Sequence, residues 1–463
     1  MNHEKQVGTD PTQMHKFDPK STEIIFSYLR ERLSLKETPL DFPGDKEVLA
    51  KAISGLINPD GNSVEKVMEI YDQVISRSVI SGDSPRFLAF IPVAPTKAAL
   101  LFDMIVSAAS LQGISWLEAA GAVAAENQVL SWMAQSAGMP NSAGGTFVSG
   151  GSAANLAALT VARDVGRRKL SDNTKPRIPV RIAMSKQAHS SIGNSLSILD
   201  VEPLLVETKT DRLTGEDLKL ALAEQTPNSA PVVAVVATAG TTNAGIVDDL
   251  ASVSKVAQEN NLWLHVDAAY GGAALLAPSV KNLFSGIEFA DSITMDPHKW
   301  WFAPFDVAAI IYRDPKLAKS VHTQEASYLD VLHTEEEVWN PTDYAYHLTR
   351  RARGLPLWFS VVVNGTNAYR DAVEESLTLT KQVAQLIKDD PNLELVMEPT
   401  LSVILWRRKG WQPSDYAKMQ DRLLENQTAF VTPTSWKGET VGRFAFINPN
   451  TTLDMVKEIF AQI

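Results

Sequence analysis

Lys299 has the setting in this sequence that most favours covalent chemistry. It follows a short apolar run in the stretch Ser-Ile-Thr-Met-Asp-Pro-His-Lys-Trp-Trp (residues 292–301), and such a run is typical of a buried strand. Apolar and aromatic neighbours desolvate a lysine, so its amine is neutral often enough to attack a carbonyl and form a Schiff base. Most lysines after strands are solvated loop residues, so this pattern alone is weak evidence.

Asp267 ends a second apolar run, Leu-Trp-Leu-His-Val-Asp (residues 262–267), and is followed by small residues. Ligands of open α/β sheets bind outside the carboxyl ends of the strands, so we expect Asp267 and Lys299 to share one crevice. A carboxylate there suits the pyridine nitrogen of pyridoxal phosphate, because a close ion pair of about 4 kcal/mol keeps that nitrogen protonated. Taken alone, Asp267 reads better as a helix cap or a turn residue.

A glycine-rich turn precedes an Ala- and Leu-rich helical pattern that extends to about Leu170. Its residues Gly150, Gly151 and Ser152 suit a phosphate, because glycines allow close approach and the N–H groups at a helix start point at the anion. Neither a dinucleotide-binding fingerprint nor a Walker loop is present at this turn. Without further signals, such a turn is an ordinary loop.

The order of these three features is more specific than any one of them. It resembles that of the fold-type I pyridoxal-phosphate enzymes and, among them, the group II amino acid decarboxylases typified by aromatic-L-amino-acid decarboxylase. The likeness covers roughly residues 80–450, and its matching segments are residues 149–155, 188–191, 237–242, 265–270 and 297–300, with residues 87–92 upstream and 350–353 downstream.

The resemblance implies a role for each matching residue around pyridoxal 5'-phosphate. Lys299 would hold the cofactor's aldehyde, Asp267 would pair with the pyridine nitrogen, and His189 would stack on the ring near the substrate carboxylate. The remaining cofactor-binding residues implied are Gly150, Gly151 and Ser152 at the phosphate, His298 close by, and Thr242 and Ala269 beside the ring.

For three residues in or next to the matching segments, the sequence also allows another interpretation. A histidine placed like His189, ahead of two serines, is more often a surface or helix-capping residue. His265 shares a strand face with Asp267 and is expected to be packed or to orient a neighbour rather than to catalyse. Some relatives carry an amide where this chain has Asp296, and a carboxylate near a phosphate repels it unless a histidine or lysine compensates.

The resemblance points to Tyr328, in a mobile loop, as the acid that protonates the intermediate after carbon dioxide leaves. Related aldehyde synthases have phenylalanine there, so Tyr328 favours simple decarboxylation; the alternative is an ordinary surface tyrosine.

The resemblance also places the substrate side chain against residues that could equally be core: Phe90, Ile91, Pro92 and Trp116. These favour an aromatic or other apolar L-amino acid, although Val93 stands where a hydroxyl would meet a phenol.

Composition limits the protein's partners. The net charge of −11 disfavours nucleic acid, and the absence of cysteine excludes disulfides, thiolate metal sites and cysteine nucleophiles; no metal is expected. A basic start followed by an apolar leader is absent, as is an apolar run of about 18 residues. We therefore expect a soluble cytoplasmic protein with no membrane or nucleic-acid partner, and the resemblance implies that its substrate is a small molecule, an amino acid.

The alternation of Ala-rich helical patterns with apolar strands (residues 178–184, 232–238, 263–267 and 307–312) predicts an α/β fold. We expect a fold-type I large domain at 81–357, with a mostly parallel sheet between helices, and a small α/β domain at 358–463 with strands near 393–397, 401–406 and 441–447 and a closing helix. Residues 1–80 would form a helical arm, with helices from Pro19 and over 45–57 and a third capped by Asn62 and Glu65. The resemblance implies that this arm embraces a second subunit in a homodimer, with the active site at the subunit interface.

Two other classes of protein remain open. An aminotransferase or carbon–sulfur lyase of fold-type I would share Lys299 and Asp267 but give no reason for His189 and Tyr328. A non-enzymatic cofactor-binding protein would leave Tyr328 without a role. The cluster Arg350, Arg351 and Arg353 could bind a carboxylate or close the dimer, but a solvated, salt-bridged face is at least as consistent with the pattern.

Overall fold

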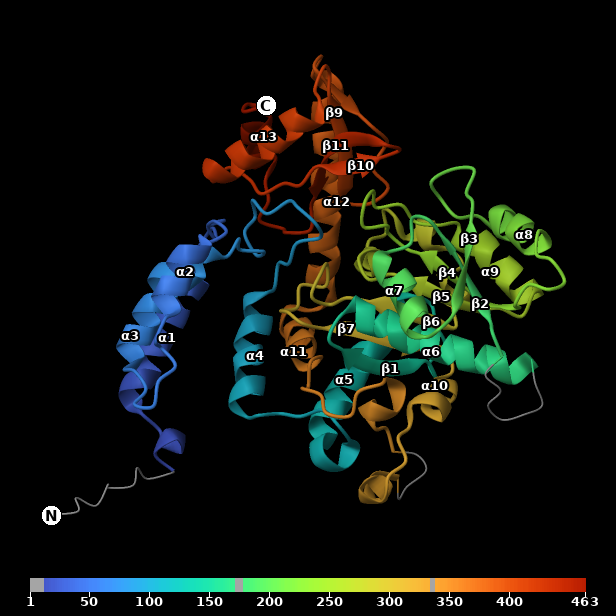
Figure 1. Cartoon of the computed structure of the whole chain (residues 1–463), viewed down its shortest axis with the longest axis horizontal. Helices are drawn as coiled ribbons and strands as arrows, with labels where there is room; N and C mark the ends of the chain where they lie inside the picture. The colour runs from blue at the N-terminus through green and yellow to red at the C-terminus, as the bar shows by residue number, and fades with distance from the viewer. Residues whose placement is uncertain (1–11, 171–177, 334–337) are drawn as a thin grey trace. The chain divides into compact units, whose positions relative to one another are not determined.

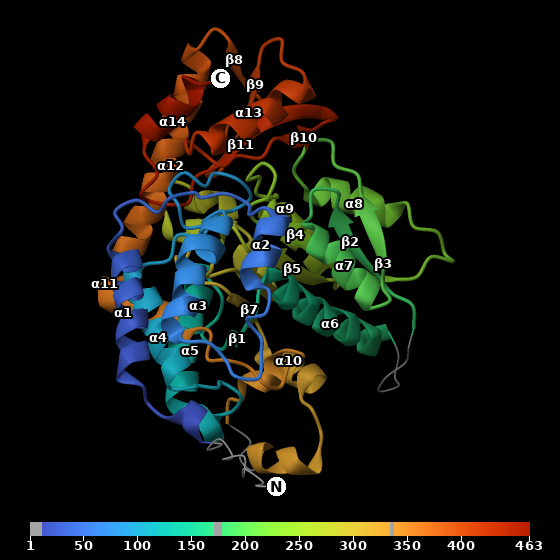
Figure 2. The same ribbon diagram turned by 60° about the vertical axis from the view of Figure 1, so that its left-hand side comes forward.

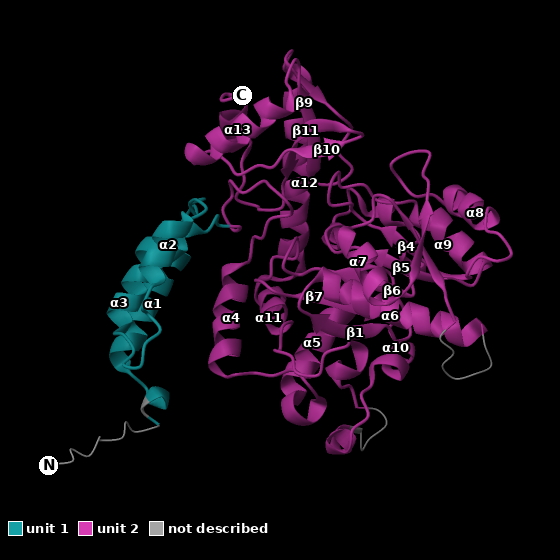
Figure 3. Ribbon diagram, in the orientation of Figure 1, with its two compact units in different colours: residues 1–81 teal, residues 82–463 magenta. Residues whose placement is uncertain are grey.

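The computed structural model describes residues 12–170, 178–333 and 338–463. It comprises two compact units, Met1–Ser81 and Gly82–Ile463, which are coloured separately in Figure 3. Within the described residues, no helix combines the length and the apolar character needed to span a membrane.

The described residues of the first unit, 12–81, form the α-helices α1 (Pro19–Ser34), α2 (Lys46–Ile53) and α3 (Val64–Ile70). Each begins at a side-chain cap: Asp18, Asp45 and Ser63 accept hydrogen bonds from the first-turn backbone N–H groups. The predicted capping pair Asn62 and Glu65 is therefore wrong, because Ser63 has the extended backbone and the short hydroxyl that capping requires. The predicted helix over 45–57 ends earlier, at Ile53. None of the residues in α1, α2 or α3 is buried.

A seven-stranded sheet forms the centre of the described part of the second unit (Figure 1). The strand order is β1-β7-β6-β5-β4-β2-β3, and only β7 runs antiparallel to its neighbours. The strands are β1 (Gly144–Val148), β2 (Arg181–Ser185), β3 (Glu202–Val206), β4 (Val232–Thr238), β5 (Trp263–Asp267), β6 (Ser292–Met295) and β7 (Ala308–Tyr312). The predicted α/β class with a mostly parallel sheet is confirmed.

Both faces of this sheet are buried, because successive strand residues enter two separate hydrophobic clusters. In β4, for example, Val235 and Ala237 belong to one cluster and Ala234 and Val236 to the other. Helices α5 (Trp116–Ser136), α8 (Gly215–Ala223) and α9 (Leu250–Glu259) contribute to the first cluster. Helices α6 (Gly151–Leu170), α7 (Ser190–Ile198) and α10 (Pro315–His322) cover the second face. Helix α4 (Lys97–Ala108) packs instead against α11 (Leu355–Asn364).

The C-terminal region carries a second, smaller sheet in the order β10-β11-β9-β8. Helix α12 (Thr366–Asp389) reaches it from α11, as Figures 1 and 2 show, after a break at Gly365, whose φ of 77° suits glycine. The other elements are β8 (Leu393–Leu395), β9 (Val403–Arg408), α13 (Pro413–Glu425), β10 (Thr434–Trp436), β11 (Glu439–Ala445) and α14 (Leu453–Phe460). Sequence predicted β8, β9, β11 and α14 to within a few residues but missed the three-residue β10.

A buried ion pair joins α5 to the segment before α11. The guanidinium of Arg350 binds the carboxylate of Glu126 through contacts of 2.8 and 2.9 Å, and the side chains are 1% and 2% exposed. Glu126 also accepts the Gly354 N–H at 2.7 Å. The interpretation of this arginine cluster as a solvated face is wrong for Arg350, whereas the next residue, Arg351, pairs with Asp103 at a partly exposed site.

Replacing Arg350 by methionine should destabilise the protein by about 3–5 kcal/mol, because the carboxylate of Glu126 is left buried and unpaired. The matched change Arg351→Met should cost at most about 1 kcal/mol, since its ion pair is partly solvated. Urea unfolding followed by tryptophan fluorescence measures both. Adding Glu126→Leu to Arg350→Met should restore much of the lost stability; equal losses for the two arginine variants would contradict this account.

Candidate active site

The segments that follow five of the parallel strands meet at one edge of the large sheet. Strands β1, β2, β4, β5 and β6 all run parallel, so the segments that follow them emerge on the same side. The segment after β1 contains the glycine turn, that after β2 contains His189, and that after β6 contains Lys299, while β5 ends at Asp267.

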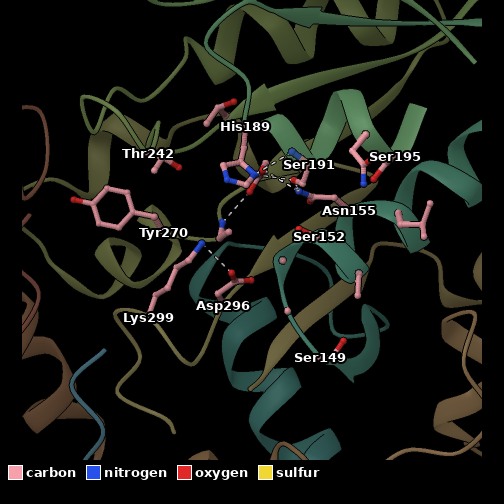
Figure 4. A pocket seen from close by; sticks show the side chains of 18 of the residues that line it. Ser149, Ser152, Asn155, His189, Ser191, Ser195, Thr242, Tyr270, Asp296 and Lys299 are labelled. Atoms are coloured by element: carbon pink, nitrogen blue, oxygen red, sulfur yellow. Dashed lines mark hydrogen bonds and ion pairs between the residues drawn. The ribbon is translucent and has the colours of Figure 1, made fainter. Parts of the chain in front are cut away.

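A cavity of about 540 Å³ lies at this edge. All nine residues that the sequence assigned to the cofactor line it: Gly150, Gly151, Ser152, His189, Thr242, Asp267, Ala269, His298 and Lys299. Figure 4 shows several of them converging from different elements. The carboxyl-edge prediction that Asp267 and Lys299 share a crevice is confirmed.

Lys299 reaches the cavity from the loop between β6 and β7. Its ammonium lies 2.9 Å from Asp296 Oδ2, and its side chain is 20% exposed (Figure 4). The next two residues, Trp300 and Trp301, are fully buried, and Trp300 stacks on Tyr270 with ring centroids 5.4 Å apart. These anchored indoles restrict the backbone that carries Lys299, so the amine enters the cavity from a rigid base.

Asp296 lies beneath the glycine turn. A Cβ on Gly151 would come within 2.7 Å of Asp296 Oδ2, so any larger residue there would displace the Asp296 carboxylate. Two basic side chains lie near that oxygen, Lys299 at 2.9 Å and His298 Nε2 at 3.7 Å, and thereby provide the compensation that a carboxylate near a phosphate needs. Asp296 Oδ1 is buried and has no hydrogen-bond partner among the described residues.

The imidazole of His298 contacts the backbone of Val307. Its Nδ1 lies 2.7 Å from the carbonyl oxygen of Val307 and 3.3 Å from the backbone nitrogen of the same residue. Burial, followed by the charge of Lys299, lowers the pKa of His298, while the charge of Asp296 opposes this shift. The imidazole therefore contributes less positive charge beside Asp296 than Lys299 does.

Asp267 is 5% exposed and accepts two hydrogen bonds. The Ala269 N–H donates to Oδ1 at 3.1 Å, and Asn155 Nδ2 donates to Oδ2 at 3.0 Å. Hydrogen bonds of this kind stabilise the ionised form of a carboxylate. The arrangement therefore offers a negative charge to a cationic group in the cavity.

His189 caps helix α7 and also lines the cavity. Its Nδ1 accepts the Ser191 N–H at 3.2 Å, so the helix-capping alternative describes its local bonding correctly. His265 lies behind the cavity wall, is fully buried and contacts Asn155 Oδ1 at 3.0 Å through Nε2. Burial lowers the pKa of His265 to about 4, so the ring is neutral at physiological pH.

Sequence reasoning missed further residues that line the cavity, among them Asn155, Ser191, Asn194, Ser195, Tyr270 and Tyr346. Asn155 could have been found, because it lies four residues after Gly151 and hence on the same face of α6. Thr242 is held by a residue of the C-terminal sheet: its carbonyl oxygen accepts a hydrogen bond of 2.6 Å from the side chain of Arg443 in β11. The C-terminal sheet therefore helps to hold one wall of the cavity.

The residues predicted for the substrate and for protonation lie outside this chain's cavity lining. Phe90 is 59% exposed in a left-handed backbone conformation, and Trp116 is 41% exposed at the start of α5. Ile91 packs against the main core, and Pro92 is buried. Tyr328 is 70% exposed in the 3-10 turn Ser327–His333. Their proposed roles remain predictions.

A metal centre is not evident at the cavity or elsewhere in the described residues, where no group of three histidine or acidic side chains could hold an ion.

The family model described as the pyridoxal-dependent decarboxylase conserved domain matches residues 50–409. This chain belongs to the pyridoxal-dependent decarboxylase family. The aromatic-L-amino-acid decarboxylase of Bacillus atrophaeus is 28% identical over 97% of this chain and 95% of its own length. The L-2,4-diaminobutyrate decarboxylase of Acinetobacter baumannii is 26% identical over 91% of this chain and 87% of its own.

A solved structure agrees in fold. The crystal structure of Oryza sativa TDC with PLP and tryptamine has a TM-score of 0.87, is 24% identical, and is matched over 96% of this chain and 98% of that one. The predicted fold-type I architecture is thus confirmed. Membership of the family makes the protein a pyridoxal-phosphate-dependent amino acid decarboxylase. The cavity fits this cofactor, since it combines a lysine, a buried carboxylate and a glycine turn in which a Cβ on Gly151 would crowd Asp296.

Replacing Asp296 by asparagine should strengthen pyridoxal 5'-phosphate binding by up to about tenfold, because the part of its negative charge that Lys299 and His298 do not balance repels the phosphate. Fluorescence titration of the cofactor-free protein measures the dissociation constant. Pyridoxal, which lacks the phosphate, is the matched control, and its affinity should not rise. An equal gain for both compounds would show that the carboxylate acts on Lys299 instead.

Proposed function

We propose that this enzyme removes the carboxylate of an aromatic or other apolar L-amino acid as carbon dioxide and releases the amine. The observation that carries the proposal is the convergence of Lys299, Asp267, His189 and the glycine turn on one cavity. When bound, pyridoxal 5'-phosphate supplies a protonated ring that accepts electrons as the bond from Cα to the carboxylate breaks.

In this proposal each residue of the cavity has one task. Lys299 holds the cofactor covalently, and Asp267 keeps the ring nitrogen protonated by offering it a buried negative charge. Gly150, Gly151 and Ser152 bind the phosphate with N–H and hydroxyl donors at the start of α6, and His298 lies beside them. His189 would cover the ring and lie near the substrate carboxylate, while Thr242 and Ala269 would border the cofactor.

The proposed substrate class is based on the side chains that are expected to contact the substrate. Phe90, Ile91, Pro92 and Trp116 are apolar or aromatic, and Val93 offers no hydroxyl to a substrate phenol. A buried apolar contact area favours an apolar side chain over an acidic one, which would need a cation. Since the relatives act on aromatic and on diamino substrates, the choice among amino acids is part of the proposal.

We also propose a homodimer in which each cavity is completed by the other subunit. Support comes from exposed aromatic side chains at sites expected to act on the substrate: Phe90, Trp116 and Tyr328 are 59%, 41% and 70% exposed. Exposed side chains of the arm, such as Phe17 at 77% and Phe26 at 51%, add apolar surface that a partner would cover. The division into arm (1–80), large domain (81–357) and small domain (358–463) belongs to this proposal, as does the cytoplasmic location.

Tyr328 would give a proton to the substrate Cα after carbon dioxide has left. A phenol is a competent donor there because it has a transferable O–H, whereas phenylalanine has none. The second candidate function is an aldehyde synthase, in which oxygen reacts before protonation; the presence of tyrosine at 328 argues against it.

Product analysis tests the reaction class. The purified enzyme, supplied with pyridoxal 5'-phosphate and a panel of L-amino acids, should yield equal amounts of amine and carbon dioxide, with aromatic or apolar substrates used faster than acidic ones. Lys299→Ala should lose roughly a thousandfold or more in kcat, because no amine remains to hold the cofactor. A keto acid product would identify an aminotransferase, and undiminished turnover by the Lys299 variant would refute the role of this lysine.

Replacing Tyr328 by phenylalanine should divert product from amine to aldehyde, ammonia and peroxide, measured together by chromatography and a peroxide assay. If Tyr328 acts in the partner's cavity, dimers that combine one Lys299→Ala chain with one Tyr328→Phe chain contain one intact site. Co-expression with two affinity tags should then restore about half of the amine-forming activity per dimer. Restoration will not occur if Tyr328 acts within its own chain, and an unchanged amine yield in Tyr328→Phe would remove it from the acid role.

A further inference from the structure

A chain of buried hydrogen bonds runs behind the cavity from β5 and β6 into α6. Trp263 Nε1 donates to Ser292 Oγ at 2.9 Å, and Ser292 Oγ lies 2.9 Å from His265 Nδ1. His265 Nε2 lies 3.0 Å from Asn155 Oδ1, and Asn155 Nδ2 donates to Asp267 Oδ2 at 3.0 Å. All five side chains are at most 5% exposed, so water does not compete for these bonds.

The two ends of the chain determine the direction of every bond between them. Asp267 Oδ2 accepts, so the amide of Asn155 must turn its NH₂ group toward it and its oxygen toward His265. His265 Nε2 must then carry the ring proton, and Nδ1 must accept the hydroxyl proton of Ser292. The indole of Trp263, which can only donate, occupies one of the two acceptor sites of the Ser292 hydroxyl. The neutral state of His265 is consistent with this assignment.

A branch of the chain leads to His189. Asn155 Nδ2 also donates to Ser191 Oγ at 3.0 Å, and this hydroxyl lies 2.9 Å from His189 Nδ1. The Ser191 N–H donates to the same ring nitrogen, so Nδ1 is an acceptor and the ring proton is on Nε2. Figure 4 shows Asn155, Ser191 and His189 joined in this way.

We propose that Asn155 is a positioning residue for catalysis, whose single amide orients the carboxylate of Asp267 and, through Ser191, the imidazole of His189, and that Ser292 and His265 hold this amide in its working orientation. The inference rests on the proposed function, in which Asp267 faces the pyridine nitrogen and His189 covers the ring. It adds that these two groups are coupled, because one amide serves both.

The structure offers a matched pair of variants on β6. Ser292→Ala removes the hydroxyl that directs His265, whereas Thr294→Val removes a buried hydroxyl, two residues away on the same strand, that has no hydrogen-bond partner among the described residues. Asn155→Asp keeps the shape of the amide but replaces the donor facing Asp267 by an acceptor. Circular dichroism and thermal unfolding confirm that each variant is folded.

Two measurements on the full-length enzyme separate positioning from mere stability: the dissociation constant of pyridoxal 5'-phosphate and the pH titration of the bound cofactor's absorbance. Ser292→Ala should weaken binding by about threefold to tenfold, because the hydroxyl's buried hydrogen bonds to His265 and Trp263 are both lost. Asn155→Asp should weaken it by about tenfold to a hundredfold and move the titration midpoint by roughly one pH unit. Thr294→Val should change the dissociation constant by no more than about twofold and should leave the titration midpoint where it is.

Asp267→Asn distinguishes the failure of this inference from the failure of the proposed function. If Asp267→Asn leaves the absorbance titration unchanged, Asp267 does not act on the ring nitrogen and the proposed function is wrong in that respect. If Asp267→Asn shifts the titration but the Asn155 and Ser292 variants behave like Thr294→Val, the positioning role alone is overturned. A double-mutant cycle between Asn155→Asp and His189→Gln should show strong non-additivity in cofactor affinity, and additive effects would contradict the coupling.

Discussion

The common direction of five strands is the constraint on which the cavity depends. Because β1, β2, β4, β5 and β6 run parallel, residues far apart in sequence emerge at one edge, and a lysine, a carboxylate, a histidine and a glycine turn meet there. A parallel sheet requires helices on both faces, which explains why almost all of its side chains are buried and why only the strand ends are free to bind a ligand. The antiparallel β7, inserted between β1 and β6, leaves this edge intact.

Two buried carboxylates in this cavity have opposite surroundings. Asp267 receives hydrogen bonds from a backbone N–H and an amide, neither of which carries charge, so its negative charge remains available to a ligand. Asp296 lies 2.9 Å from the ammonium of Lys299, so its charge is largely balanced within the protein. The same side-chain type can therefore attract a cationic ring nitrogen at one position and secure a lysine at another, since the neighbours decide which charge remains unbalanced.

Much of the fold and part of the site could be predicted from the sequence, because their signals are local. The apolar run ending at Asp267 and the glycines at 150 and 151 specify a strand end and a helix start by themselves. The carboxyl-edge rule then brings them together without knowledge of the remaining contacts. The cap at Ser63 was missed because neighbouring polar residues compete for the same position, and only backbone geometry decides among them.

Contacts between residues far apart in the sequence could not be predicted from local patterns. Arg350 looks like part of an exposed basic cluster, yet its partner Glu126 lies 224 residues away, and only their burial identifies the pair. The sequence placed His265 as a packed residue beside Asp267, but its contact with Asn155, which joins a strand to a helix across 110 residues, could not be predicted. Polar residues of this sort resemble surface residues in sequence until the fold supplies a partner.

The C-terminal sheet supports the cavity wall through hydrogen bonds to residues of the large sheet's loops, although none of its own residues lines the cavity. Arg443 of β11 binds the carbonyl oxygens of Thr242 and Asn243, and Ser402 donates its N–H to the phenol oxygen of Tyr270, which also lines the cavity. Chimaeras that exchange this region between relatives must therefore transfer matching residues at 242–243 and 270. Without these matching residues, the exchanged C-terminal region could fold correctly and still displace the cavity wall that would face the cofactor.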